Sequence, residues 1–184
     1  MSQKPTIAST MAFIDRLFHG VTDKGGRPYA GHCFRVMERL PAAASLDEKL
    51  AALLHDVIED TPTTADDLRR MGYSERAIWL VEKLSRPPAS AGPRLSYIDW
   101  IRSIAATSDA GLIAIKLADN ADNSDPERIA ALPESERSII RRYERAREIL
   151  TAAQARAAYI SMPACAYPEC GGECDGCANG RAQG

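Results

Sequence analysis

Apolar residues recur every three or four positions along most of the chain, and no segment shows the strict alternation that is typical of a half-buried strand. Short segments rich in glycine, proline and small polar residues separate these stretches. The pattern predicts an all-α fold in which helices are joined mostly by short loops. The expected helices span residues 7–18, 28–40, 45–62, 63–71, 74–84, 95–106, 109–120 and 134–159.

One loop is unusual. Residues 85–94, SRPPASAGPR, contain three prolines and a glycine and cannot form regular structure. A connection of this length is long for two helices, and such loops are often functional. A connector without function is the alternative.

The stretch AALLHDVIEDT, residues 51–61, does not read as an ordinary core helix. At roughly 100° per residue its four ionisable side chains fall within an arc of about 140°, and aliphatic side chains fill the opposite side. These four are His55, Asp56, Glu59 and Asp60. Carboxylates crowded around an imidazole repel one another unless a cation lies among them, and a divalent metal is the simplest candidate. A solvated acidic face on a surface helix is the alternative.

Two other predicted helices carry polar stripes at i, i+3, i+7 spacing. The stripes are Lys116, Asp119 and Asn123 in one helix, and His32, Arg35 and Arg39 in the other. The first lies on an otherwise apolar helix and is not expected to face an apolar core. The last helix, residues 134–159, is rich in arginine and glutamate at i, i+4 spacing and is expected to be a solvated outer helix.

Composition narrows the class of protein. With 184 residues, of which 45% are hydrophobic and 26% charged, the chain is long enough to bury one compact core. No apolar run approaches the ~18 residues of a membrane-spanning helix. The N-terminus lacks a signal-peptide pattern, so a cytoplasmic protein without a membrane partner is expected. The net charge of −2 argues against a broad basic surface for a nucleic-acid polymer.

Four of the five cysteines lie close together near the C-terminus. They form a C-x4-C-x3-C-x2-C pattern made by Cys165, Cys170, Cys174 and Cys177. Four thiolates with glycines between them can wrap one Zn²⁺, and a disordered tail with free thiols is the alternative. The chain therefore divides into a main domain, residues 1–159, and a short Cys-rich tail, residues 160–184. The fifth cysteine, Cys33, is expected to be a small buried hydrophobe.

Three motifs in order carry a family resemblance: PYAGH at residues 28–32, HDVIED at 55–60 and KLADNADN at 116–123. Together they resemble the HD-domain metal-dependent phosphohydrolases, and most closely the RelA/SpoT-type alarmone hydrolases and their small stand-alone relatives. The resemblance covers residues 7–150. It implies that residues 1–159 form an HD-domain helical bundle.

By this resemblance, three helices contribute the ligands of one metal ion. The implied ligands are His32, His55, Asp56 and Asp119. Two imidazoles and two carboxylates suit Mn²⁺ or another divalent cation better than a structural zinc. Because the chain has only three histidines, a mononuclear centre is favoured over the dinuclear variants of the family.

The family pattern also places Glu59 and Asp60 next to the water of the metal. A carboxylate one turn beyond the ligands can take a proton from that water. Glu59 is the first choice for this role, with Asp60 assisting. The alternative for either residue is support that orients His32 or His55.

The resemblance is less complete at the residues expected to contact the substrate. Asn123 resembles the substrate-contacting amide of the family, and Lys116 either faces substrate phosphates or balances the charge of a ligand. In the alarmone hydrolases the loop before PY usually carries an Arg-Lys pair that holds the guanine base. Here that loop reads VTDKGGR, with Asp23 where a cation is expected. Lys24 and Arg27 are the candidates to replace the pair.

The resemblance implies a hydrolase that removes the 3′-pyrophosphate of (p)ppGpp-like nucleotides. The altered loop keeps open a nucleotidase or pyrophosphatase that acts on another nucleotide, and a nucleotide-binding module without turnover is a further alternative. The presence of every ligand and acidic position favours the enzyme. The sequence does not fix the oligomeric state.

Overall fold

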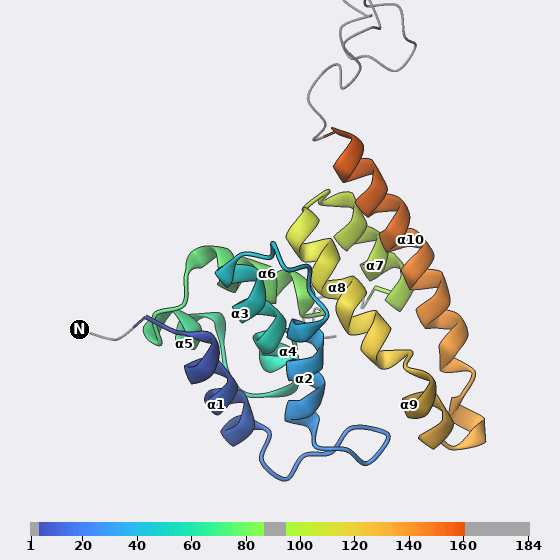
Figure 1. The fold of residues 1–184 in the computed structure, drawn as a ribbon, viewed down its shortest axis with the longest axis horizontal. Helices are drawn as coiled ribbons and strands as arrows, with labels where there is room; N and C mark the ends of the chain where they lie inside the picture. The colour runs from blue at the N-terminus through green and yellow to red at the C-terminus, as the bar shows by residue number, and fades with distance from the viewer. Residues whose placement is uncertain (1–3, 87–94, 161–184) are drawn as a thin grey trace, which may run out of the picture.

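The computed structural model describes residues 4–86 and 95–160, and regular structure within these ranges is helical. In chain order the elements are α1 (Ile7–Leu17), α2 (Tyr29–Glu38), α3 (Leu46–Leu54), α4 (Val57–Asp60), α5 (Ala65–Arg70), α6 (Glu75–Leu84), α7 (Tyr97–Ala106), α8 (Ala110–Asn123), α9 (Pro126–Ala131), the 3-10 turn η2 (Glu134–Glu136) and α10 (Ile139–Ile160) (Figure 1). The only β pairing in these ranges is one bridge between Thr22 and Pro28. The all-α prediction is confirmed.

Two predictions fall partly or wholly outside the described residues. They concern the loop of residues 85–94, most of which is not described, and the tail of residues 160–184 with Cys165, Cys170, Cys174 and Cys177. Zinc binding by these cysteines and the domain boundary near residue 160 therefore stay predictions.

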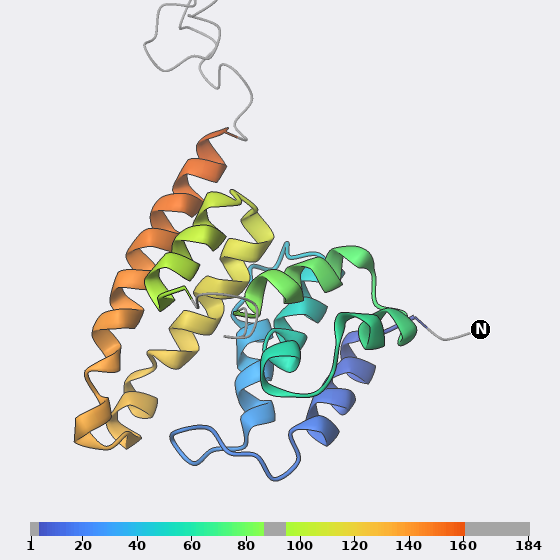
Figure 2. The same cartoon turned by 180° about the vertical axis from the view of Figure 1, so that it is seen from behind.

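The helices form two halves that share α8. In one half α3 is central and contacts α1, α2, α6 and α8. In the other half α10 lies along α7 and α8, as the front and back views both show (Figures 1 and 2). Since α8 contacts both α3 and α10, its different faces bring side chains to both halves.

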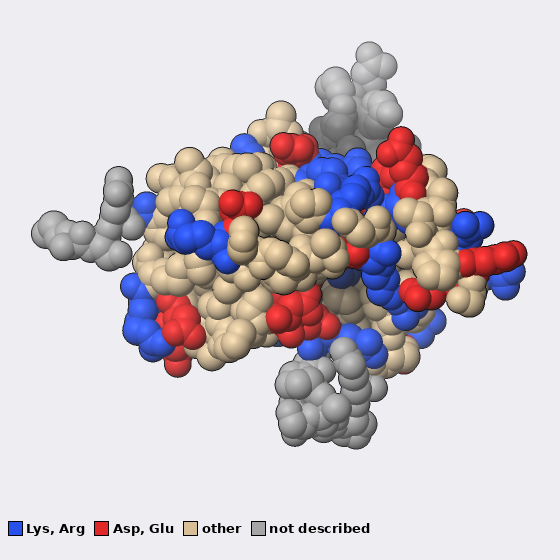
Figure 3. Space-filling model, turned by 90° about the horizontal axis from the view of Figure 1, so that it is seen from below, with Lys and Arg blue, Asp and Glu red and all other residues tan. Residues whose placement is uncertain are grey.

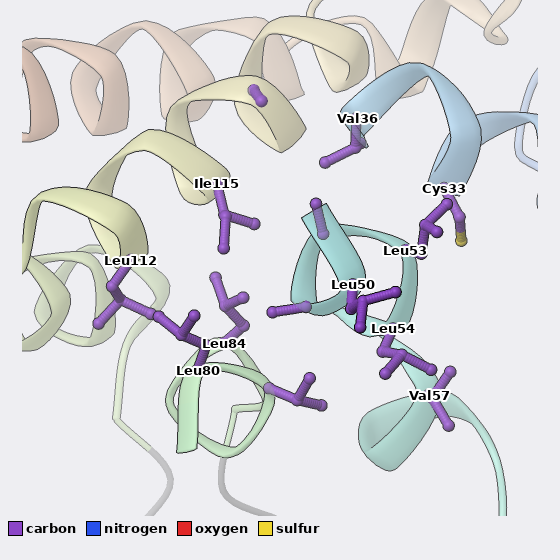
Figure 4. Close-up of a cluster of buried hydrophobic side chains, with 14 of the residues drawn as sticks. Cys33, Val36, Leu50, Leu53, Leu54, Val57, Leu80, Leu84, Leu112 and Ile115 are labelled. Atoms are coloured by element: carbon purple, nitrogen blue, oxygen red, sulfur yellow. The ribbon is translucent and has the colours of Figure 1, made fainter. Parts of the chain in front are cut away.

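The central position of α3 follows from its sequence. The helix begins with a capping box, in which the Ser45 and Glu48 side chains each accept a hydrogen bond from the backbone N–H of the other residue. Its second half, residues 50–54, is buried on every side, which is typical of a helix enclosed by others. Leu50, Leu53 and Leu54 point into a cluster of side chains from α2, α6 and α8 (Figure 4).

The single helix predicted for residues 45–62 is wrong, because the chain breaks at His55 and Asp56. The backbone at Asp56 has φ −102° and ψ −1°, displaced from the typical α-helical values, and α4 starts after it. The carbonyl of Ala52, the helical partner of the residue-56 N–H, accepts a hydrogen bond from His55 Nδ1 at 2.8 Å. The buried His55 imidazole thus competes with the backbone N–H of Asp56 for the carbonyl of Ala52.

The last third of the chain also differs from the prediction. The short helix α9 was not expected, although Asp125 at its N-cap and Pro126 in its first turn are helix-start signals. The long helix begins at Ile139, and a solvated outer helix describes only one of its faces, because Ala146 and Leu150 are fully buried. Neither α10, with 22 residues, nor any other helix in the described ranges has the length and apolar character needed to cross a membrane.

Replacing Leu53 by alanine is expected to lower the free energy of unfolding by about 2–5 kcal/mol, because the side chain is fully buried and its loss leaves a cavity. Leu46→Ala in the first turn of the same helix is the matched control, since Leu46 is 53% exposed. Its effect is expected to stay within about 0.5 kcal/mol. Urea denaturation followed by circular dichroism measures both, and equal losses would contradict the central position of α3.

Candidate metal centre

Side chains from three helical segments meet between the two halves of the molecule. His32 comes from α2, His55 and Asp56 from the junction of α3 and α4, and Asp119 from α8. The candidate ligand atoms of His32, His55 and Asp56 all lie within 4.8 Å of one another. Asp119 Oδ1 is 3.4 Å from His32 Nε2 and 3.7 Å from His55 Nε2. The structure thus brings together the four side chains predicted as ligands.

Both imidazoles turn Nε2 toward this cluster because Nδ1 is held by another group. His55 Nδ1 donates to the Ala52 carbonyl, and His32 Nδ1 donates to Asp122 Oδ2, each at 2.8 Å. With one ring proton on Nδ1, Nε2 is the nitrogen that can bind a cation after losing its own proton. The buried His55 Nε2 lies 2.8 Å from Asp56 Oδ2 and 3.7 Å from Asp119 Oδ1. An imidazole nitrogen buried among carboxylates is suited to a divalent cation, so this donor set fits such an ion.

The two carboxylates are held in their charged form. Burial raises the pKa of Asp56, but the neighbouring His55 imidazole outweighs this effect and lowers the pKa to about 2. Burial acts in the same way on Asp119, and Lys116 brings its pKa well below the usual value. Conversely, burial lowers the pKa of His55, but Asp56 and Asp119 raise it to about 10. A cation therefore has to displace a proton from His55.

Asp119 is also fixed by its own helix. The buried Lys116 places Nζ 2.6 Å from Asp119 Oδ2 and 4.2 Å from the centre of the Trp100 ring. Asn123 donates a hydrogen bond to Asp119 Oδ1. Lys116 therefore balances the charge of this carboxylate. Lys116 and Asn123 also line the cleft beside the cluster, where a substrate contact by either residue stays a prediction.

Asp122 is the important buried residue that sequence reasoning missed. Besides His32, its carboxylate accepts two hydrogen bonds from Arg35, at 2.7 and 3.0 Å, and one from Arg39 at 3.2 Å. Arg128 of α9 lies 3.4 Å away. Burial would raise the pKa of Asp122, but the hydrogen bonds from His32 and Arg35 hold it well below its usual value. The stripe of one histidine and two arginines on α2 was the available signal, because it needs a carboxylate opposite.

Glu59 and Asp60 lie at the outer edge of the cluster, at the end of α4. Glu59 Oε2 accepts a hydrogen bond from the backbone N–H of Arg86 at 2.8 Å. The Tyr29 hydroxyl lies 2.5 Å from Asp56 Oδ2 and 3.1 Å from Asp60 Oδ2, so it bridges a candidate ligand and a second carboxylate. Partial loss of hydration, together with the charge of Asp56, raises the pKa of both Glu59 and Asp60. A raised pKa makes either carboxylate a better proton acceptor.

The cluster forms one side of a cleft of about 330 Å³, a volume that suits a small molecule. The remaining lining is largely cationic and aromatic. It includes Lys24, Arg86, Tyr97, Trp100, Arg142 and Tyr143. Seen from below, acidic and basic surfaces border a hollow (Figure 3). The cleft therefore pairs a carboxylate-rich side with a side that attracts anions.

Sequence reasoning found only Lys24 on this second side. Tyr97 and Trp100 of α7 both line the cleft, although Trp100 is otherwise buried. Arg142 and Tyr143 belong to the helix that was expected to be solvated throughout. The spacing of residues within one segment cannot show that α7 and α10 are neighbours. This cationic and aromatic side of the cleft forms only when the two helices pack together.

The loop of residues 21–27 explains the unusual Asp23. This buried side chain accepts hydrogen bonds from the backbone N–H groups of Gly25 and Arg27, at 2.8 and 3.0 Å. It also lies 3.8 Å from Arg27 Nε and 3.6 Å from Arg128 Nη1. Asp23 therefore shapes the loop. Lys24 lines the cleft, whereas Arg27 contacts Asp23 and is not among the cleft-lining residues.

Comparisons with known proteins agree with this arrangement, although no model of a known protein family matches the chain. Over 105 residues the chain is 34% identical to guanosine-3′,5′-bis(diphosphate) 3′-pyrophosphohydrolase of Aquifex aeolicus, a match that covers 54% of this chain and 14% of that protein. Over 115 residues it is 35% identical to the bifunctional (p)ppGpp synthase/hydrolase SpoT of Escherichia coli, covering 56% of this chain and 15% of that protein.

A solved structure of a metazoan ortholog of SpoT that hydrolyzes ppGpp has the same fold. The TM-score is 0.67 at 19% identity, and the match covers 86% of this chain and 96% of the other. The resemblance to RelA/SpoT-type HD hydrolases is confirmed. The described helices form an HD-type bundle, and the chain spans about one seventh of the length of the curated relatives it matches.

Asp122→Asn is expected to weaken Mn²⁺ binding roughly 10- to 100-fold, because the carboxylate that orients His32 loses its charge. Asp125→Asn is the matched control: Asp125 lies 3.7 Å from Arg39 and caps α9, and asparagine preserves a cap. Isothermal titration calorimetry with Mn²⁺ measures both affinities. An Asp122 variant that binds Mn²⁺ as the wild type does would show that His32 needs no charged partner.

Proposed function

We propose that this protein is a metal-dependent phosphohydrolase that removes the 3′-pyrophosphate of guanosine 3′,5′-bis(diphosphate) and related nucleotides. The observation that carries the proposal is the convergence of two imidazoles and two carboxylates on one side of a cleft whose other side is cationic. The names of the curated relatives and the fold of the metazoan SpoT ortholog support the choice of reaction.

His32, His55, Asp56 and Asp119 are the proposed ligands. A divalent cation held there, for which we propose Mn²⁺, would polarise phosphoryl oxygens and lower the pKa of a water molecule. The protein contributes the fixed orientation of the ligands. Ala52 and Asp122 set the two imidazole rings, and Lys116 holds Asp119.

Glu59 is the proposed proton acceptor. Its carboxylate lines the cleft beside the candidate ligands, and its raised pKa favours uptake of a proton from an attacking water. Asp60 assists from the neighbouring position and is oriented by Tyr29, which links it to Asp56. Lys116 and Asn123 are proposed to contact the phosphates, since both line the cleft beside Asp119.

A second substrate class has a specific observation in its favour. Asp23 occupies the place of an expected cation and engages Arg27, so Lys24 is the cation that the loop of residues 21–27 gives to the cleft among the described residues. A site that reads the base weakly would accept another phosphorylated nucleotide with the same chemistry. A nucleotide-binding module without turnover is disfavoured because every ligand and acidic position is present.

The test is release of pyrophosphate or phosphate from a panel of nucleotides in the presence of Mn²⁺. Wild type is expected to release pyrophosphate from guanosine 3′,5′-bis(diphosphate). Asp119→Ala should abolish turnover through loss of a ligand, and Glu59→Gln should lower kcat roughly 10²- to 10⁴-fold through loss of the proton acceptor. Asp66→Asn on the exposed surface of α5 is the control.

The outcomes separate the candidates. Turnover of a different nucleotide, still lost in Asp119→Ala, would keep the chemistry and replace the substrate. Mn²⁺ binding without turnover of any nucleotide would overturn the enzyme and support the binding module. Wild-type kcat in Glu59→Gln would transfer the proton-accepting role to Asp60.

A further inference from the structure

A second cavity adjoins the candidate catalytic cleft. It measures about 420 Å³ and is lined by Lys24, Glu136, Ser138, Ile139 and Arg142. Three of these residues, Lys24, Ile139 and Arg142, also line the cleft itself. No proposed metal ligand lies in the outer cavity. A ligand held at the metal side can therefore extend past Lys24 and Arg142 into a separate space.

Arg142 is held in place by aromatic rings. Its guanidinium carbon lies 4.7 Å from the centre of the Tyr97 ring and 5.8 Å from that of Tyr143. The two rings come from α7 and α10 and meet edge to face at 6.3 Å. Within the described ranges Arg142 has no carboxylate partner in an ion pair. Rings orient a guanidinium without neutralising it, so its hydrogen-bond donors stay available to an anion.

Lys24 supplies a second cation on the shared boundary. Its ammonium lies 3.6 Å from Glu136, but the two side chains are 60% and 49% exposed. Exposed ion pairs of this kind contribute little free energy, so a stronger anion can replace Glu136 as the partner of Lys24. The boundary therefore offers one oriented arginine and one lysine that can change partner.

The distribution of charge along the two cavities indicates which ligand fits. Carboxylates gather at the metal side, which would take the phosphoryl group that is cleaved. Lys24 and Arg142 lie where the cleft adjoins the outer cavity, whose lining contains no proposed ligand or proton acceptor. We propose that Lys24 and Arg142 form a subsite for a second phosphate group that is not cleaved, carried by a nucleotide phosphorylated at two separate positions. This inference rests on the proposed function and assigns the 5′-phosphates to the outer cavity.

Glu136 allows a test in which substrate binding is expected to become tighter. It lines the outer cavity but not the cleft, and there it repels an incoming phosphate and competes for Lys24. Removing its charge should strengthen binding of a substrate with 5′-phosphates. Removing the charge of Arg142 should weaken binding of the same substrate.

The experiment compares guanosine 3′,5′-bis(diphosphate) with guanosine 3′-diphosphate, which has the same scissile group and no 5′-phosphates. Arg142→Gln and Lys24→Gln are each expected to raise KM about ten-fold for the first nucleotide, the usual effect of one lost charged hydrogen bond. For both variants kcat for the first nucleotide should stay at the wild-type value. For Arg142→Gln both constants for the second nucleotide should also stay unchanged. Glu136→Gln should lower KM for the first nucleotide only.

Arg145→Gln is the matched control, since Arg145 lies one turn along α10, pairs with Glu148 at 2.7 Å and lines neither cavity. It should leave all constants unchanged. Equal changes for both nucleotides in Arg142→Gln, or no change in Arg142→Gln and Lys24→Gln, would overturn the subsite while leaving the hydrolase intact.

Failure of the proposed function has a different signature. If wild type hydrolyses neither nucleotide, calorimetric binding of the same two nucleotides to wild type and Arg142→Gln tests the subsite directly. Weaker binding of only the 5′-phosphorylated nucleotide in the variant supports it. Equal affinity of wild type for both nucleotides, or binding of neither, overturns it.

Discussion

The fold depends on keeping a set of ionisable groups paired inside a helical bundle. His32, His55, Asp119 and Asp122 are all buried, and a buried charge is tolerated only when it is paired and hydrogen-bonded. The local irregularities of the structure follow from this constraint. His55 takes the carbonyl of Ala52 and ends α3, and the break turns two side chains that are neighbours in sequence into neighbours in space, with His55 Nε2 2.8 Å from Asp56 Oδ2. A continuous helix would have kept these groups about 100° apart.

The apolar framework makes this arrangement rigid. The second half of α3 is enclosed by α1, α2, α6 and α8, so the end that carries His55 has little freedom to move. The helix α8 presents Lys116, Asp119 and Asp122 at spacings of three residues and packs on both halves. One helix therefore supplies a candidate ligand, the cation that balances it and the carboxylate that orients His32. Precise placement of this kind is easier on packed helices than on loops.

The sequence predicted what depends on spacing within one segment and missed what depends on packing between segments. The candidate ligands His32, His55, Asp56 and Asp119 came from three motifs in a known order, and the structure brings these residues together. Asp122 shares the face of Asp119, but its role depends on its contacts with Arg35, Arg39 and Arg128. These three arginines come from α2, the residue after it, and α9. The break at His55 could not be predicted from periodicity, because the pattern of apolar residues continues across it. The wall of Tyr97, Arg142 and Tyr143 exists only because α10 packs on α7.

Arg128 connects the loop of residues 21–27 with the candidate metal centre. Arg128 Nη1 lies 3.4 Å from Asp122 Oδ2, which holds His32, and 3.6 Å from Asp23 Oδ2, which shapes the loop that carries Lys24. Asp23, Asp122 and Arg128 are all buried, so their mutual attraction is screened less by solvent than that of a surface pair. A displacement of the loop that moved Asp23 away from Arg128 would leave the cation to Asp122 alone. The orientation of a candidate ligand and the position of a cleft-lining cation are thus linked through one side chain, and the unusual Asp23 is the residue that makes the link.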